Sequence, residues 1–331
     1  MHEVAIFGAG RIGRIHAHNL AAMAGIKLKY VFDPIREPAQ ELANALGATV
    51  ADPSTIFADK TVGSIVIASP ATTHRDLILA AVKAGKPIFC EKPVDMNAAS
   101  AAECAEATRS ARIGCMTGFQ RRFDPTFSSA KDRLDRGEIG NPEMLIVTSR
   151  DPGAPPVSYL KQSGGIFNDM LIHDFDIVRW ILCSDGDEPE WIFADGSCII
   201  DPAMEAIPDL GSVIVNIRTR RGRLAQINAQ RRAAYGYDQR FEVLGSKGML
   251  QCGNHRPSEV IQSDGHGIHT DLPENFFLQR YREAYRLELE HFFARLQDGK
   301  PFRTTIEDGV AAQKLAEAAT QSWQTGQKVK L

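Results

Sequence analysis

The chain has 331 residues, of which 44% are hydrophobic and 24% charged, and its 38 Lys and Arg residues against 41 Asp and Glu residues leave a net charge of −3. This composition excludes disordered, collagen-like and coiled-coil chains, and the near-neutral balance argues against a nucleic-acid-binding surface or a polybasic membrane patch. At about 100–200 residues per domain, the length predicts two domains.

Sequence features of export and membrane insertion are also absent. No run approaches the roughly 18 apolar residues that span a bilayer, and residues 1–7 lack the basic region and cleavage site of a signal peptide. The six cysteines contain no C-x-x-C spacing and predict buried or incidental thiols rather than a disulfide framework. We therefore expect a cytoplasmic protein that acts on a small molecule.

Strands and helices alternate over the first third of the sequence. Short apolar runs, typical of strands buried on both faces, predict strands at residues 4–7, 28–32, 64–68, 88–90 and 114–117. Helical patterns separate these runs at residues 12–24, 35–46, 74–84 and 97–111. The alternation predicts an α/β Rossmann-type domain, with a doubly wound parallel sheet, over residues 1–118.

The pattern changes after Gly118. Helices are predicted at residues 125–136, 168–182, 278–296 and 306–325. Strands are predicted at residues 143–150, 190–198, 212–219, 223–229, 239–244 and 248–252, while residues 151–156 and 266–269 are expected to form loops. Strands gathered in this way and joined by short turns predict a large, mostly antiparallel sheet. We therefore expect an α+β domain over residues 119–331.

A G-x-G-x-x-G motif lies between the first predicted strand and the first predicted helix. Its first glycine makes the tight turn, its second lets a pyrophosphate approach the backbone, and its third lets the helix pack on the strand. The helix N-terminus adds N–H groups and the positive end of its dipole. A glycine-rich turn can also arise for structural reasons alone. The dinucleotide-binding residues expected here are Gly8, Ala9, Gly10, Arg11, Ile12 and Gly13.

Asp33 ends the second predicted strand, about 25 residues after Gly8. A carboxylate at this position can accept hydrogen bonds from the adenosine ribose hydroxyls and would repel a 2′-phosphate. Asp33 therefore favours NAD over NADP as the cofactor. Arg36 is also expected near the ribose, where it could instead pair with a 2′-phosphate. The alternative for Asp33 is a turn residue before Pro34.

Lys92 follows the predicted strand at residues 88–90, and ligands of parallel sheets bind beyond the carboxyl ends of the strands. Pro93 restricts the backbone of Lys92 and allows a cis peptide. A surface lysine in a turn is the alternative. Ser69, Glu91 and Lys92 are expected to contact the cofactor.

Three segments together resemble the glucose–fructose oxidoreductase/inositol dehydrogenase/rhizopine-catabolism (Gfo/Idh/MocA) superfamily: the glycine motif at residues 8–13, residues 91–93 (EKP) and residues 164–174 (GGIFNDMLIHD). The resemblance covers essentially the whole chain. Within the superfamily the sequence is most similar to the inositol 2-dehydrogenases, through residues 118–124, 149–152 and 276–281.

Asp169 and His173 are spaced to lie one turn apart on one face of the predicted helix at residues 168–182, where an isolated pair would simply be solvated. The resemblance implies that both surround the substrate carbinol together with Lys92. Histidine, whose unperturbed pKa is about 6.5, is suited to accept the hydroxyl proton. We therefore predict His173 as the general base, Asp169 as its partner and a polyol ligand, and Lys92 as a proton-relay group that favours developing alkoxide charge.

The resemblance implies further substrate contacts from Arg122, Asp151 and Tyr235, with Tyr237 as the alternative to Tyr235. Asp151 can equally be a turn residue before Pro152. Gln120 stands where inositol dehydrogenases often carry asparagine, which leaves the stereoisomer open. His16 could approach the cofactor. No metal site is expected, because the histidines at 266 and 269 lack accompanying acids or cysteines.

The expected function is NAD-dependent oxidation of a cyclic polyol, with myo-inositol converted to scyllo-inosose. Alternatives within the superfamily are a scyllo- or chiro-inositol dehydrogenase and an aldose 1-dehydrogenase. A non-catalytic NAD-binding regulator and an NAD-dependent glycosidase are alternatives of other classes. The expected partners are a polyol or sugar and further copies of the chain, in a dimer or tetramer formed through the open face of the antiparallel sheet, with no nucleic acid and no membrane.

Overall fold

The structure, a computed structural model, describes residues 1–200, 204, 207 and 209–331. The chain forms two compact units. The first unit combines Met1–Phe123 with Ala284–Lys314, and the second combines Asp124–Glu283 with Leu315–Leu331. A late stretch of sequence thus packs with the first unit. The assignment of NAD binding and substrate binding to residues 1–118 and 119–331 stays a prediction.

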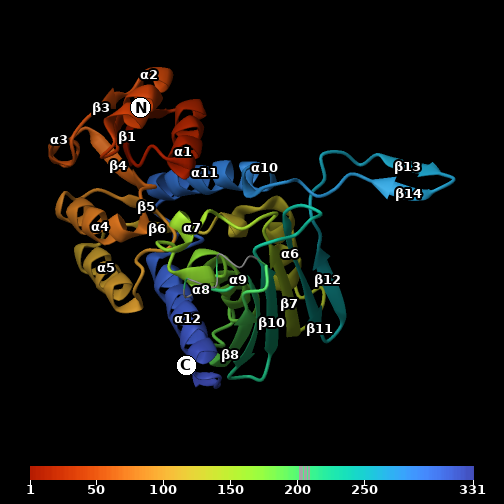
Figure 1. The fold of residues 1–331 in the computed structure, drawn as a ribbon. Coiled ribbons are helices and arrows are strands. Elements are labelled where there is room, and N and C mark those ends of the chain that lie inside the picture. The colour runs from red at the N-terminus through yellow and green to blue at the C-terminus, as the bar shows by residue number, and fades with distance from the viewer. Residues whose placement is uncertain (201–203, 205–206, 208) are drawn as a thin grey trace. The chain divides into compact units, whose positions relative to one another are not determined.

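The first unit contains a six-stranded sheet in the order β3-β2-β1-β4-β5-β6, and all of its strand pairs are parallel (Figure 1). Its strands are β1 (His2–Phe7), β2 (Ile26–Phe32), β3 (Thr49–Val50), β4 (Val62–Ile67), β5 (Ile88–Glu91) and β6 (Cys115–Gly118). Its helices within residues 1–123 are α1 (Arg11–Ala22), α2 (Arg36–Leu46), α3 (Pro53–Ala58), α4 (His74–Lys83) and α5 (Ala98–Ala111), with short 3₁₀ turns η1 (Ala71–Thr73) and η2 (Gln120–Phe123). The predicted doubly wound parallel sheet is confirmed.

Alternate residues of these strands enter two separate hydrophobic cores. Val4 and Ile6 of β1 face one core, while Ala5 and Phe7 face the other. Both faces are therefore covered, which explains why the strands read as continuous apolar runs. Helix α11 (Arg282–Asp298) contributes to the first core, and the start of α12 (Ile306–Thr325) contributes to the second. This packing explains why residues 284–314 belong to the first unit.

The second unit contains a seven-stranded sheet in the order β12-β11-β7-β10-β9-β8-β15. The strands are β7 (Pro142–Arg150), β8 (Pro189–Ser197), β9 (Ser212–Thr219), β10 (Leu224–Gln230), β11 (Asp238–Gly245), β12 (Gly248–Cys252) and β15 (Val329–Lys330). The β7–β10 pair is parallel and the other pairs are antiparallel, so the predicted mostly antiparallel sheet is confirmed. The other helices of this unit are α6 (Pro125–Asp135), α7 (Val157–Leu160), α8 (Gly165–Asp169), α9 (Ile172–Leu182) and α10 (Phe277–Arg280).

The single helix predicted over residues 168–182 is wrong. Helix α8 ends at Asp169, because the N–H groups of Met170 and Leu171 both donate to the carbonyl of Ile166, at 3.0 and 2.9 Å. A new helical register then starts with the bond from Phe175 N to Leu171 O at 2.8 Å. Asp169 and His173 consequently lie in different helices and do not share one helix face.

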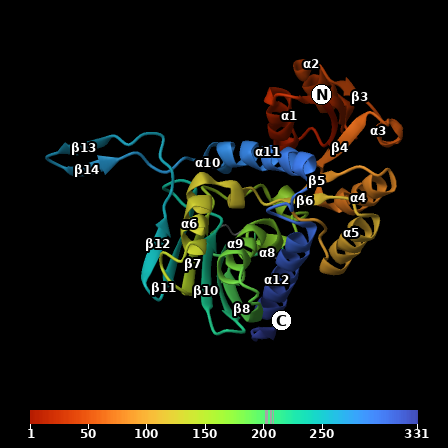
Figure 2. The ribbon, with the colours of Figure 1, turned by 180° about the vertical axis from the view of Figure 1, so that it is seen from behind.

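Two further predictions of local structure were wrong. Tyr281, with φ −112° and ψ 17°, ends α10, so the helix expected over residues 278–296 is divided into α10 and α11. The expected loop around residues 266–269 is part of a hairpin, formed by β13 (Ile261–Asp264) and β14 (Gly267–Thr270). In Figures 1 and 2 this hairpin projects away from the sheet of its unit.

Candidate active site

The turn between β1 and α1 has the geometry of a dinucleotide-binding loop. Gly8 has φ +108°, and a Cβ there would lie 2.4 Å from Ala68 O. A Cβ on Gly13 would lie 2.0 Å from Gly8 O, whereas one on Gly10 would meet no atom of the described residues within 4 Å. Chain packing therefore requires Gly8 and Gly13 but not Gly10. The open space at Gly10, next to the first N–H groups of α1, fits the approach of a pyrophosphate.

Asp33 lies directly after β2 and is hydrogen-bonded to this loop. Its Oδ2 accepts a bond from Ala9 N at 2.8 Å, and its Oδ1 accepts one from Ile35 N at 2.9 Å. The bond from Ile35 N is the interaction expected of a turn residue, which was the alternative role for Asp33. A carboxylate has about four acceptor positions, so a ribose diol can be bound as well. Arg36 is exposed at the start of α2.

Glu91 directs its carboxylate into the first unit. Its Oε1 lies 2.7 Å from His16 Nε2, and its Oε2 accepts a bond from the backbone N–H of Lys92 at 3.2 Å. The Lys92–Pro93 peptide is cis, the geometry that the sequence allows. His16 therefore contacts Glu91 through Nε2, and Glu91 in turn holds the backbone of Lys92.

Glu288 of α11 is a buried acid that sequence reasoning missed. Its side chain is 0% exposed, and neither carboxyl oxygen has a hydrogen-bond partner among the described residues. One ligand atom each from His16, Glu91 and Glu288 lies within 4.8 Å of the others. Burial, and then the nearby charge of Glu91, raise the pKa of Glu288 well above its ordinary value. We therefore expect Glu288 to be protonated, because two adjacent buried carboxyls disfavour each other's negative charge.

His74, another residue without a sequence motif, connects two loops at the carboxyl ends of the parallel strands. Its Nδ1 lies 2.7 Å from Pro93 O, and its Nε2 lies 2.9 Å from Ser69 O. Burial lowers the pKa of His74. The ring thus lies between the loop that carries Ser69 and the loop that carries Lys92, within hydrogen-bond distance of a carbonyl of each. Ser69 is also held through its Oγ, 2.6 Å from Thr73 Oγ1.

In the second unit, Asp169 is held at both carboxylate oxygens. Tyr159 Oη donates to Oδ1 at 2.8 Å, and Arg231 Nη1 donates to Oδ2 at 3.1 Å. His173 is the second residue of α9 and is buried. The role of Asp169 as the partner of His173 stays a prediction.

The other expected substrate residues have defined structural contacts. In the first unit, Arg122 is buried against Asp308, with Nη2 to Oδ1 at 3.1 Å. In the second, Asp151 N donates to Gln230 O at 2.9 Å just after β7. Tyr235 is 38% exposed and bonds to Arg150 and Asp238, whereas Tyr237 is buried among aromatic rings. The exposed Tyr235 therefore remains the better candidate of the two tyrosines.

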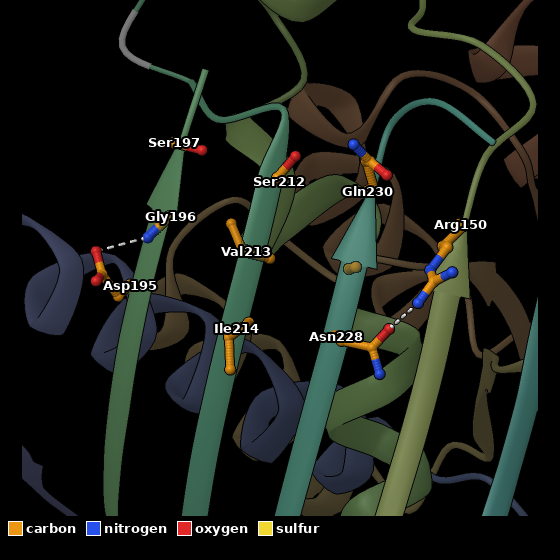
Figure 3. Close-up of a pocket in the computed structure, with 10 residues that line it drawn as sticks. Arg150, Asp195, Gly196, Ser197, Ser212, Val213, Ile214, Asn228 and Gln230 are labelled. Atoms are coloured by element: carbon orange, nitrogen blue, oxygen red, sulfur yellow. Dashed lines mark hydrogen bonds between the residues drawn. The ribbon is translucent and has the colours of Figure 1, made fainter. Parts of the chain in front are cut away.

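A cavity of about 510 Å³ lies on the second unit alone, over β7, β8, β9 and β10 (Figure 3). Its lining includes Arg150, Ser212, Asn228 and Gln230, and Arg150 Nη2 donates to Asn228 Oδ1 at 2.8 Å. Figure 3 shows helices behind these strands. Ile214, which lines the cavity, is 51% exposed, so the cavity opens on the solvent-exposed face of the sheet. Neither Asp169 nor His173 lines it.

Comparison with known proteins gives family matches over both parts of the chain. The model "Oxidoreductase family, NAD-binding Rossmann fold" matches residues 2–119, and "Oxidoreductase family, C-terminal alpha/beta domain" matches residues 131–331. Both models describe the Gfo/Idh/MocA oxidoreductases.

Similar proteins extend over nearly the full length. An inositol 2-dehydrogenase of Rhizobium meliloti is 43% identical over 96% of this chain and 95% of its own. A myo-inositol 2-dehydrogenase of Thermotoga maritima is 40% identical over 99% and 98%. The crystal structure of a scyllo-inositol dehydrogenase from Lactobacillus casei, with bound NAD(H) and scyllo-inositol, has a TM-score of 0.93 at 27% identity and covers 100% of this chain and 99% of its own.

Proposed function

The chain belongs to the Gfo/Idh/MocA oxidoreductase family, and from this premise we propose that it oxidises myo-inositol to scyllo-inosose with NAD as the hydride acceptor. The class of enzyme, an NAD-dependent dehydrogenase, follows from the family. The observation that carries the choice of substrate is the near full-length similarity to inositol dehydrogenases at 40–43% identity.

The proposed cofactor site is the turn between β1 and α1 together with Asp33. The backbone N–H groups at the start of α1 would bind the pyrophosphate, and the Asp33 carboxylate would accept hydrogen bonds from the ribose. Ser69 and Lys92, on the loops that His74 connects, would complete the site at the carboxyl ends of β4 and β5. NAD supplies the acceptor for the hydride; the protein supplies orientation and proton transfer.

The proposed chemistry assigns the proton to His173. As the hydride leaves the carbinol carbon, His173 takes the proton of the hydroxyl, and the C–O bond becomes a carbonyl. Lys92 would hydrogen-bond the reacting oxygen and favour its developing negative charge. Asp169 would bind a polyol hydroxyl and stabilise the protonated imidazole. These roles balance one hydride and one proton lost from the alcohol.

A second candidate substrate is scyllo-inositol. A scyllo-inositol 2-dehydrogenase of Bacillus subtilis, named with NAD(+), is 36% identical over 100% of this chain. The two inositols differ only in the configuration of one hydroxyl, so a few side chains around the ring decide between them. Gln120 is buried, and its Nε2 donates to Tyr285 Oη at 3.3 Å, which is a contact within the first unit.

The test is the formation of NADH, followed by absorbance, with NAD and NADP each tried against inositol epimers and aldoses. We expect reduction of NAD with myo-inositol. If NAD is reduced faster with scyllo-inositol or an aldose, that compound replaces myo-inositol as the proposed substrate. If no free polyol supports reduction, the proposal is refuted. Turnover of a glycoside would then favour an NAD-dependent glycosidase, and the lack of any turnover would favour a non-catalytic NAD-binding regulator.

We propose that the uncovered face of the second unit's sheet joins copies of the chain in a dimer or tetramer. Met249, Leu244, Met144 and Leu224 are register neighbours on β12, β11, β7 and β10 and are 39–48% exposed. They form one apolar row across four strands, as expected for a contact surface. Light scattering should give an oligomer, and Leu244→Glu should weaken it; a monomeric wild-type protein would contradict the proposal.

The chain is also proposed to act in the cytoplasm. Cys90, Cys104, Cys115 and Cys252 are buried thiols, which supports this proposal. Within the described residues, no helix is both long and apolar enough to cross a membrane. Fractionation of cells that produce the protein tests the location.

A further inference from the structure

Arg231 is the largest fully buried side chain of the described residues, and it lies between two carboxylates. Its Nη1 donates to Asp169 Oδ2 at 3.1 Å, and its Nη2 donates to Asp209 Oδ2 at 3.2 Å. The Arg231 side chain is 0% exposed. Removing a guanidinium from water is costly, and hydrogen-bonded partners such as these two carboxylates compensate that cost.

Arg231 is fixed by the sheet. It follows β10 and continues the buried face formed by Ala225, Ile227 and Ala229, and its backbone N–H donates to Gly211 O at 2.8 Å. A guanidinium on a rigid strand end presents its donors in one direction, and its planar fork fixes both partners. Arg231 can therefore hold the end of α8 at a fixed position relative to the sheet.

Asp209 holds the opposite end of the same short helix. Its Oδ1 accepts bonds from Ile166 N at 2.7 Å and from its neighbour Leu210 N at 2.8 Å. Gly165 has φ +83°, a backbone conformation that suits glycine, and it lies beside Asp209. Asp209 thus binds the start of α8 and Arg231 binds its last residue, which clamps the helix at both ends.

We propose that Arg231 and Asp209 are positioning residues that hold the Asp169 carboxylate for its contact with the substrate. This inference rests on the proposed function, because it assigns a catalytic contact to Asp169. Arg231 and Tyr159 bond to different oxygens of this carboxylate, which fixes its orientation. A shift of about 1 Å in such a group is enough to lower turnover by about 100-fold.

The experiment compares three variants with the wild type. Arg231→Met combined with Asp209→Asn removes the guanidinium together with one of its two carboxylate partners, so that Asp209 is not left as a buried charge without its cation. Arg231→Lys keeps the charge but loses the fork. Arg232→Met is the matched control, since the neighbouring guanidinium donates to a backbone carbonyl, Ile200 O, at 2.9 Å.

We expect the double variant to bind NAD within about twofold of wild type but to lose about 100-fold in kcat. Arg231→Lys should recover part of that loss, and Arg232→Met should have wild-type kcat. A folded double variant with kcat within about threefold of wild type would overturn the inference. So would equal losses in Arg231→Met/Asp209→Asn and Arg232→Met.

Hydrogen exchange supplies a readout that does not depend on the substrate. Peptides that cover residues 165–171 should exchange at least about tenfold faster in the double variant, while peptides from α1 keep their rates. Unchanged exchange at residues 165–171 would overturn the clamp. If the wild type oxidises no polyol but exchange accelerates as expected, the proposed function fails while the clamp on Asp169 stands.

Discussion

Replacing the buried Glu288 by glutamine is expected to stabilise the protein, and to do so more strongly as the pH rises. The wild-type carboxyl is fully buried near Glu91, and its pKa is raised well above its ordinary value. Below about pH 4.3 it is protonated in both the folded and the unfolded chain, so the wild type carries no ionisation penalty there.

Above that pH the unfolded chain ionises at Glu288 while the folded chain keeps its proton. The free energy of unfolding therefore falls by about 1.4 kcal/mol per pH unit until the pH reaches the folded-state pKa. Between pH 5.5 and 7.5 the loss is at most about 2.7 kcal/mol. Glutamine has nearly the same shape, can donate to Glu91 and does not ionise, so Glu288→Gln should lack this loss.

Urea unfolding of the two proteins, followed by circular dichroism from pH 5.5 to 8, measures the difference. Glu290→Gln is the matched control, because this side chain of the same helix is 42% exposed. A stability difference between Glu288→Gln and wild type that does not grow with pH would refute the reasoning. A wild type destabilised by a chelator would show that a cation, and not a proton, occupies the cluster of His16, Glu91 and Glu288.

Three further predictions concern the cofactor loop and the base. His173→Ala should lower kcat by about 10²–10⁴-fold with little change in the Kd of NAD, and near-normal turnover would remove His173 as the base. Gly13→Ala should fail to fold, because its Cβ would lie 2.0 Å from Gly8 O, whereas Gly10→Ala should keep its Tm and lose NAD affinity by about tenfold or more. Thermal melts and NAD titrations separate the two, and equal behaviour would contradict the assigned roles. Asp33→Ser should lower the kcat/KM preference for NAD over NADP by about tenfold or more, and an unchanged ratio would show that Asp33 only closes the turn.

The local pattern of the sequence was sufficient for the nucleotide-binding part. Apolar runs of strand length, separated by helical patterns, predicted the parallel sheet, because strands buried on both faces must be apolar throughout. The glycines at 8, 10 and 13 predicted the turn after β1, and the structure shows that the close packing of strand, turn and helix requires the first and the third of them. The motif around residues 164–174 drew attention to Asp169 and His173 through family resemblance, not through geometry.

Tertiary packing decided what surrounds those residues. The change of register at Met170 and Leu171 separates Asp169 from His173, and no periodicity in the sequence marks a single extra residue between hydrogen-bonded turns. Arg231 was detectable only as a charge on the buried face of a strand, and its partners come from segments 22 and 62 residues away in the chain. Glu288 meets His16 and Glu91 only because α11 packs with the first unit. Burial makes the interactions of these ionisable groups strong, and which groups are buried is decided only when the chain folds.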